Sequence, residues 1–242
     1  KKCYTQSCSI QKTFLTDANL KSKGHMNNFF EVPLFPIPDL VAFPDTSMPL
    51  HVFEPRYRAM IADAVEKDRM IGITNTKKRI STPRENQSIK EALSQNQATY
   101  EPQDIFCVGA VKVLEKTKDG RIYVNINLKH RVVLIEETQT LPYRICKCKL
   151  LEDEVVESAK LVHHQQEILK QMANILQREA PTELAKFDQK SWATLDPRKF
   201  SFEIFKMIRF DPDLMQSLLE MTDPEKRLIL IKETLFGRTG SD

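Results

Sequence analysis

The stretch VPLFPIPDLVAFPDTSMPLHVFEPRYRAM, residues 32–60, decides how this chain folds. Five prolines separate its short apolar runs before Pro55 opens a different pattern. Because proline has no N–H to donate to a sheet ladder, each of the five should lie at a strand start, a sheet edge or a turn. The stretch therefore predicts two short strands, over 32–35 and 48–53, joined by a crossing that the prolines stiffen.

A helix should follow these strands. Pro55 suits the first position of a helix, where its missing N–H is not needed, and Glu54 before it is expected to cap the helix start. Apolar residues then recur at helical spacing and give the helix one apolar face. These residues are Tyr57, Met60, Ile61, Ala64 and Val65.

The clearest β region runs from 105 to 151. Asp119-Gly120 is a strong hairpin signal, and apolar and polar residues alternate over 121–128, as in a half-buried strand. Two more strands are expected, over 130–135 and 143–151.

Beyond residue 154 the apolar residues recur about every 3.6 positions, which predicts a long amphipathic helix. Three Asp-Pro pairs follow, in which the acid can cap a helix and the proline can occupy its first turn. They begin at Asp196, Asp211 and Asp223 and predict three further helices.

Two groups of motifs resemble the amino-terminal domain family of the ATP-dependent protease Lon, which is that protease's substrate-binding region. The family has a glycine at the turn position that Asp45 occupies here. The first group comprises Leu34-Phe35-Pro36-Ile37, Phe43-Pro44 and Pro49-Leu50-His51-Val52-Phe53-Glu54-Pro55-Arg56-Tyr57. The second comprises Val108-Gly109, Asp119-Gly120-Arg121, His130-Arg131-Val132 and Pro142-Tyr143-Arg144.

The resemblance covers roughly residues 32–236. It implies an α+β fold in which a strongly bent, PUA-like β-domain with an inserted helix is followed by a helical bundle. We expect the β-domain over 26–153 and the helical domain over 154–242. Within the first, residues 75–104 form a polar surface loop, because only 6 of the 30 residues over 75–104 are apolar. Residues 1–25 have no apolar face and are expected to be a tail outside the fold, with Met26 as the natural start.

Composition excludes several classes of protein. With 41% hydrophobic and 29% charged residues, the chain has the profile of an ordinary globular protein, and no apolar run approaches the roughly 20 residues of a membrane span. The formal net charge of +3 is concentrated in residues 1–25, which carry +4, so the rest of the chain is nearly neutral. A surface for nucleic acid or membrane is therefore not expected. Five cysteines and no secretory segment favour a reducing cytoplasm.

Motifs for catalysis, cofactors and metals are absent from the sequence. It contains no phosphate-binding Gly-x-x-x-x-Gly-Lys-Ser/Thr motif, no Gly-x-Ser-x-Gly and no His-Glu-x-x-His. Cys146 and Cys148 resemble half a metal site, but residues two apart on a strand share a face, so we expect them to pack in the core. His163, His164 and Glu167 are interpreted as a solvated helix face, since two ligands rarely make a metal site. We predict no enzyme activity, no cofactor and no metal.

The cluster most suggestive of a binding site lies at the strand-to-helix corner. Peptide contact is expected at His51, Phe53, Glu54, Arg56 and Tyr57. Two interpretations remain open: a polar rim on a groove, or a corner whose side chains fix the chain's own geometry. The ring of Phe53 is expected to face the core.

The function implied by the resemblance is binding without catalysis. We expect a stand-alone polypeptide-binding module, with neither ATPase nor protease segments, that recognises unfolded or extended polypeptide within a protease or chaperone system. A weak homodimer is left open. The alternative is an RNA-binding PUA-like protein, which would require a basic stripe interleaved with aromatic residues; Arg144, Lys147 and Lys149 are too few for one.

The tail interpretation gives a direct test. Deleting residues 1–25 should leave the melting temperature within about one or two degrees of the full chain, because an untethered terminus contributes little to stability. Differential scanning calorimetry of the two forms measures this, and a large loss of stability on deletion would show that the tail packs against the fold.

Overall fold

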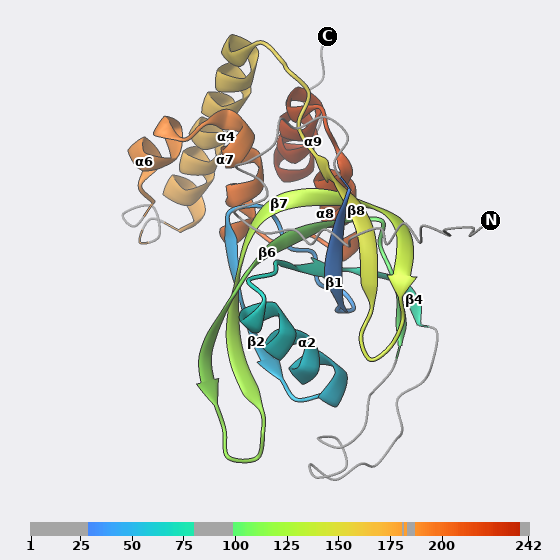
Figure 1. Cartoon of the computed structure of the whole chain (residues 1–242). Helices are drawn as coiled ribbons and strands as arrows, with labels where there is room; N and C mark the ends of the chain where they lie inside the picture. The colour runs from blue at the N-terminus through green and yellow to red at the C-terminus, as the bar shows by residue number, and fades with distance from the viewer. Residues whose placement is uncertain (1–28, 80–98, 181, 183–186, 238–242) are drawn as a thin grey trace, which may run out of the picture.

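The computed structural model describes residues 29–79, 99–180, 182 and 187–237, and shows β-strands followed by a group of helices (Figure 1). The expected α+β class, with a helix inserted in the β part and helices after it, is confirmed. The tail over 1–25 and Met26 lie outside the described residues.

The main sheet nearly closes on itself. Its strands are β1 (Phe30–Pro36), β2 (Thr46–Val52), β3 (Ile71–Thr74), β6 (Ile105–Lys116), β7 (Ile122–Gln139) and β8 (Ile145–Leu151). Their order is β2-β7-β6-β3-β1-β8, and β7 also pairs with β8. Five strands therefore form a closed ring, and β2 pairs with β7 outside it.

The long strand β7 serves both parts of this sheet. Its first half pairs with β2 and its second half with β8, so the strands expected over 121–128 and 130–135 are one bent strand. The pairing of β6 with β7 shifts register at Gly109, where an added Cβ would lie 2.1 Å from the carbonyl oxygen of Asn127. Only glycine permits this close approach of two backbones at the bend.

The opening stretch folds largely as predicted. Helix α2 (Pro55–Glu66) begins at the expected proline and buries Tyr57, Met60, Ile61 and Ala64 in the main core, while Val65 is 50% exposed. Asp45, at the position of the family's turn glycine, has a φ of +57°. Glycine adopts this left-handed conformation without strain, which explains the family's glycine at this position. Aspartate tolerates the conformation better than most other residues.

The prediction of a polar loop over 75–104 is wrong at both ends, where the structure has strands. Strands β4 (Thr76–Arg79) and β5 (Tyr100–Pro102) pair with each other at its two ends. Backbone pairing does not require an apolar face, and a cross-strand ion pair of 3.0 Å between Lys78 and Glu101 adds to it. Residues 80–98 lie outside the described part of the chain.

Several of the described helices begin where the sequence predicts, whereas two short ones, over 189–194 and 204–206, were not predicted. The described helices are α4 (Ser158–Glu179), α6 (Gln189–Thr194), α7 (Pro197–Glu203), the short 3-10 helix η1 (Ile204–Lys206), α8 (Pro212–Glu220) and α9 (Pro224–Phe236). Asp196, Asp211 and Asp223 each accept hydrogen bonds from backbone N–H groups in the first turn of α7, α8 and α9. The three Asp-Pro predictions are confirmed.

Buried cysteines occupy the core as expected. Cys146 and Cys148 are fully buried on β8, in a small second cluster with Phe106 and Val132. Burial raises the pKa of the Cys146 thiol to about 12, so it remains protonated and behaves as a small apolar group.

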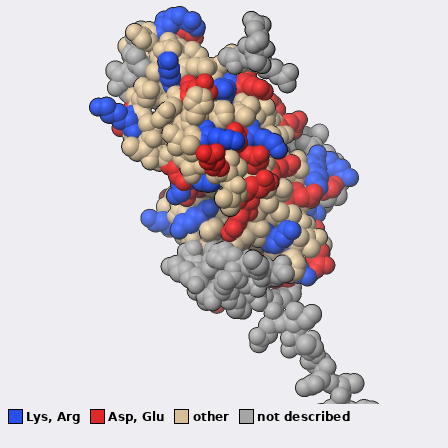
Figure 2. Space-filling model, turned by 90° about the horizontal axis from the view of Figure 1, so that it is seen from above, with Lys and Arg blue, Asp and Glu red and all other residues tan. Residues whose placement is uncertain are grey.

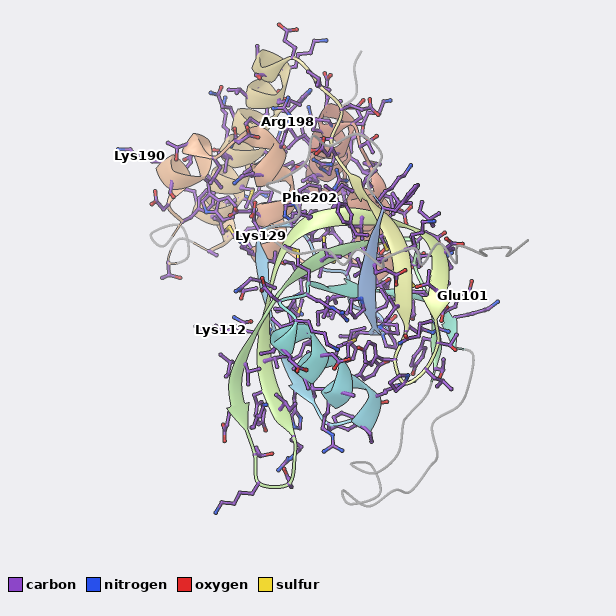
Figure 3. The ribbon with its side chains drawn as sticks, viewed as in Figure 1. Glu101, Lys112, Lys129, Lys190, Arg198 and Phe202 are labelled. Carbon is purple, nitrogen blue, oxygen red and sulfur yellow. The ribbon has the colours of Figure 1, made fainter. Side chains whose placement is uncertain are left out.

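A buried ion network joins the strands to the helices. Arg227 of α9 is fully buried and binds both carboxylate oxygens of Asp153, at 3.0 and 2.6 Å. Arg131 of β7 binds the same carboxylate, and donates to the carbonyl oxygens of Leu219 and Met221 at the end of α8. Both guanidinium groups lie over the ring of Phe202, the residue that Figure 3 labels.

Removal of one member of this network should destabilise the whole fold. Arg227→Ala is expected to lower the free energy of unfolding by about 3–5 kcal/mol, because the largely buried carboxylate of Asp153 loses a charged partner. Denaturant unfolding measures the change. The control is Arg178→Ala, which removes a solvent-exposed pair with Glu179 and should stay within about 0.5 kcal/mol. Equal effects of the two substitutions would contradict the role given to the network.

Candidate functional site

The residues predicted to form a peptide-contacting corner divide into separate groups. His51 is exposed on the outer face of β2, and its ring stacks 4.6 Å from Tyr123, its cross-strand partner on β7. Phe53 lies 5.9 Å from His51 and is only half-buried, whereas Val52 packs in the core. The expectation that Phe53 faces the core is wrong, because the strand alternation places Val52 there instead.

The remaining corner residues hold one another. Glu54 stands at the N-cap position of α2 without a capping side-chain hydrogen bond, contrary to expectation, and pairs with Arg56 at 2.9 Å. The guanidinium of Arg56 lies 4.6 Å over the ring of Tyr57. That ring is buried and stacks on Phe35 at 4.0 Å, and burial raises the pKa of the Tyr57 hydroxyl to about 12. The contacts of Glu54, Arg56 and Tyr57 match the fixed-corner interpretation.

A groove that the sequence did not predict lies on another side of β2. It has a volume of about 380 Å³ and opens between the β1–β2 connection and the link from η1 to α8. Its lining comprises Asp39, Leu40, Val41, Ala42, Phe43, Thr46, Ser47, Met48, Phe205, Lys206, Arg209, Phe210, Pro212 and Met215. The two walls are about 160 residues apart in sequence, so no local pattern could reveal them.

Stacked aromatic rings support the groove. The rings of Phe43 and Phe205 stack at 4.4 Å, and Phe210 meets Phe205 edge-on at 5.7 Å. Leu40, Met48 and Met215 are only partly buried and present apolar surface to the space. A fixed aromatic base with flexible methionine side chains suits apolar ligands of varied shape.

The backbone of a strand borders this groove. Successive side chains of a strand point to opposite faces, yet Thr46, Ser47 and Met48 all contribute to the lining. The groove therefore borders the first three residues of β2 and is not confined to one face of the strand. Among the described strands β2 pairs with β7 alone, so its other edge is available for hydrogen bonding.

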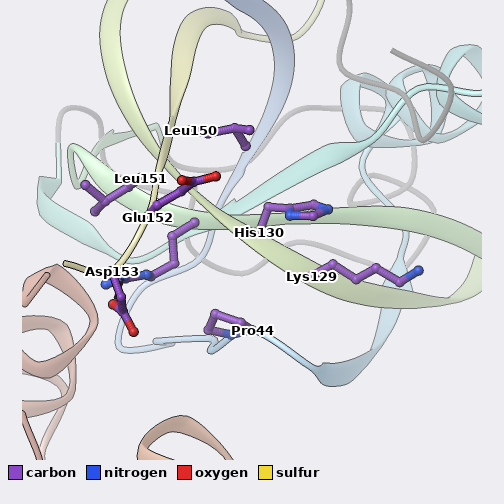
Figure 4. Close-up of a pocket in the computed structure, with 8 residues that line it drawn as sticks. Pro44, Lys129, His130, Leu150, Leu151, Glu152 and Asp153 are labelled. Carbon is purple, nitrogen blue, oxygen red and sulfur yellow. Dashed lines mark hydrogen bonds and ion pairs between the residues drawn. The ribbon is translucent and has the colours of Figure 1, made fainter. Parts of the chain in front are cut away.

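A second cavity of about 220 Å³ has Pro44 on one side and residues of β7 and β8 on the other (Figure 4). Lys129, His130 and Arg131 line it together with Glu152 and Asp153. Arg131 and Asp153 are already bound to each other. Because four of its eight lining residues are charged, whereas the larger groove has a mainly apolar lining, the cavity is a weaker candidate for an apolar ligand.

The predicted histidine face is partly solvated. His163 is 68% exposed, as expected, but His164 is only 15% exposed and lies 3.7 Å from Glu225 of α9. His164 therefore belongs to the contact between α4 and α9, contrary to the prediction. Within the described ranges no three His, Cys, Asp or Glu side chains are grouped closely enough to hold a metal ion.

The surface shows no extended region of one charge on the face seen in Figure 2, where acidic and basic side chains are interspersed. None of the described helices combines the length and the hydrophobicity that a membrane crossing requires.

Comparison with known sequences gives a consistent result. The family model of the ATP-dependent protease La (LON) substrate-binding domain matches residues 31–235. The chain is 24% identical over 213 residues to Lon protease 1 of Herpetosiphon aurantiacus, covering 85% of this chain and 24% of that protein. It is 29% identical over 128 residues to the Lon protease of Parabacteroides distasonis, covering 50% and 13% respectively. The chain thus spans about a quarter or less of the length of these relatives.

Solved structures show the same fold. A Lon N-terminal domain protein from Xanthomonas campestris superposes with a TM-score of 0.53 at 17% identity, covering 83% of this chain and 96% of that one. The N-terminal domain of a Mycobacterium avium complex Lon protease gives a TM-score of 0.56 at 15% identity, covering 84% and 96%.

The revised position of Phe53 predicts a modest role in stability. Phe53→Ala should cost less than half of the about 3–5 kcal/mol expected for Phe106→Ala, because the Phe106 ring is 1% exposed and leaves a cavity when removed. Urea unfolding of both variants provides the comparison. Similar losses of unfolding free energy in the two variants would show that Phe53 is a core residue.

Proposed function

The chain belongs to the Lon substrate-binding domain family, and on that premise we propose that it binds unfolded or extended polypeptide without catalysing any reaction. The observation that carries this proposal is the apolar groove that borders the start of β2, a strand with one edge unpaired among the described strands. An edge strand supplies backbone hydrogen bonds to any sequence, and an apolar groove beside it accepts alternate side chains.

The binding mode follows from these two parts. An extended segment pairs with the backbone at Thr46–Met48 and places apolar side chains against Phe205, Phe210 and Met215. Backbone pairing is independent of sequence, and the methionines adapt to different side chains. Weak, reversible binding of many unfolded proteins, without nucleotide, is the expected behaviour.

The predicted corner contributes in part. His51, exposed on the outer face of β2, and the half-buried Phe53, which follows that strand, are proposed as additional contacts, together with the polar pair of Glu54 and Arg56. The ring of Tyr57 is buried, so it supports the corner and does not meet the peptide.

The proposed partners follow the names of the relatives, which are proteases. We place this chain as the recognition part of a protease or chaperone system in the cytoplasm. The sequence holds no phosphate-binding motif that would supply ATP hydrolysis, so a recognition role without chemistry fits its residues.

RNA binding is the second candidate, and one surface favours it. The stacked rings of His51 and Tyr123 lie on the outer face of β2 and β7, and Lys112 and Lys129 project from the β6–β7 ribbon (Figure 3). Exposed rings and lysines are the parts of a platform for single-stranded RNA. The interspersed charges on the face seen in Figure 2 favour polypeptide binding over RNA binding.

The two candidates differ in their response to salt. We expect the chain to bind a permanently unfolded protein with little change between low and moderate salt, because apolar contacts and backbone pairing depend weakly on ionic strength. RNA binding through phosphate contacts would weaken steeply. Fluorescence anisotropy with the unfolded protein and with a mixed RNA pool separates them, and salt-sensitive RNA binding alone would reverse our choice.

Substitution in the groove adds a control. Met215→Ser should weaken binding of the unfolded protein by about five-fold or more, because it removes apolar surface from the groove. Leu141→Ser is the matched control, because Leu141 is 77% exposed and lies outside the groove lining. Equal binding by the two variants would place the binding surface elsewhere.

A further inference from the structure

The rim of the groove carries an uneven distribution of charge. Lys206 and Arg209 lie on the helical side, and Asp39 lies on the side of the β1–β2 connection. Lys206 is paired with Glu203 at 3.1 Å, one turn earlier. Arg209 is exposed and forms an ion pair with none of the described residues. The groove therefore presents one uncompensated cation on one side only.

We propose that the groove selects apolar segments that carry an acidic residue beside the apolar run, and that Arg209 is the residue that selects them. The inference rests on the proposed function and adds a specificity to it. Its ligand class is an extended peptide of apolar side chains with a neighbouring aspartate or glutamate.

The chemistry of arginine supports this assignment. A guanidinium offers two parallel N–H donors to one carboxylate, so it recognises an acidic side chain by geometry as well as by charge. Lys206 contributes less, because Glu203 already offsets its charge. An exposed ion pair between Arg209 and an acidic side chain of the peptide gives only a few-fold preference in affinity. A preference of this size suits a surface that binds many sequences with somewhat different affinities.

Asp39 gives the preference a direction. Its carboxylate repels an acidic residue on the side of the β1–β2 connection, whereas Arg209 attracts one on the helical side. The same argument disfavours segments with a lysine on the helical side, where it would meet Arg209 and Lys206. Arg209 and Asp39 thus act together on an acidic residue of the peptide, the first by attraction and the second by repulsion.

The test uses two synthetic peptides of about twelve residues with the same leucine and phenylalanine run. One carries three aspartates beside the run, and the other carries three lysines. At low salt the wild-type chain should bind the aspartate peptide about two- to five-fold more tightly. Arg209→Glu should remove or reverse that preference, and rising salt should reduce it in the wild type.

The control is Arg178→Glu, which changes the net charge of the protein equally at the end of α4 and outside the groove lining. It should keep the wild-type preference. Equal binding of both peptides by the wild type, or a preference that persists in Arg209→Glu, would overturn the inference and leave polypeptide binding intact. Failure to bind either peptide would overturn the proposed function and this inference with it. Circular dichroism of each variant confirms that it is folded.

Discussion

Two arginine side chains that are removed from water share one carboxylate where the strands meet the helices. Arg131 and Arg227 carry two positive charges against the single negative charge of Asp153. Carbonyl oxygens at the end of α8 supply the remaining negative potential, because the last carbonyls of a helix have no partner within it. A buried charge is tolerated only when paired in this way. The relative position of β7 and α8, and with it the groove, depends on this network.

Local patterns predicted the elements of the fold well. The strand-to-helix change at Pro55 and the three Asp-Pro helix starts each depend on neighbouring residues, which the sequence displays directly. The prediction put Phe53 in the core, but Val52 occupies that place. At the end of a strand, neighbouring apolar residues do not show which of the two points inward. The burial of His164 depends on α9, more than 60 residues later, so its own helix could not show it.

The groove could not be predicted because it exists only between distant segments. Phe43 and Phe205 stack across it, and neither residue carries a local sign of that partner. The network around Asp153 was missed for the same reason. Closure of the sheet has a related effect. Five strands pair with one another in a ring, and β2 lies outside the ring, with one edge unpaired among the described strands. Both features of the proposed binding surface are products of tertiary structure.

The separation of the groove's two walls also has a consequence for synthesis. One wall ends at Met48 and the other at Met215, so a growing chain has no groove until residue 215 has left the ribosome. During translation the unfinished copy is itself an unfolded polypeptide that carries exposed apolar segments. It cannot capture its own emerging residues in a surface that has not yet formed, so the proposed recognition of unfolded protein requires a chain that has already folded.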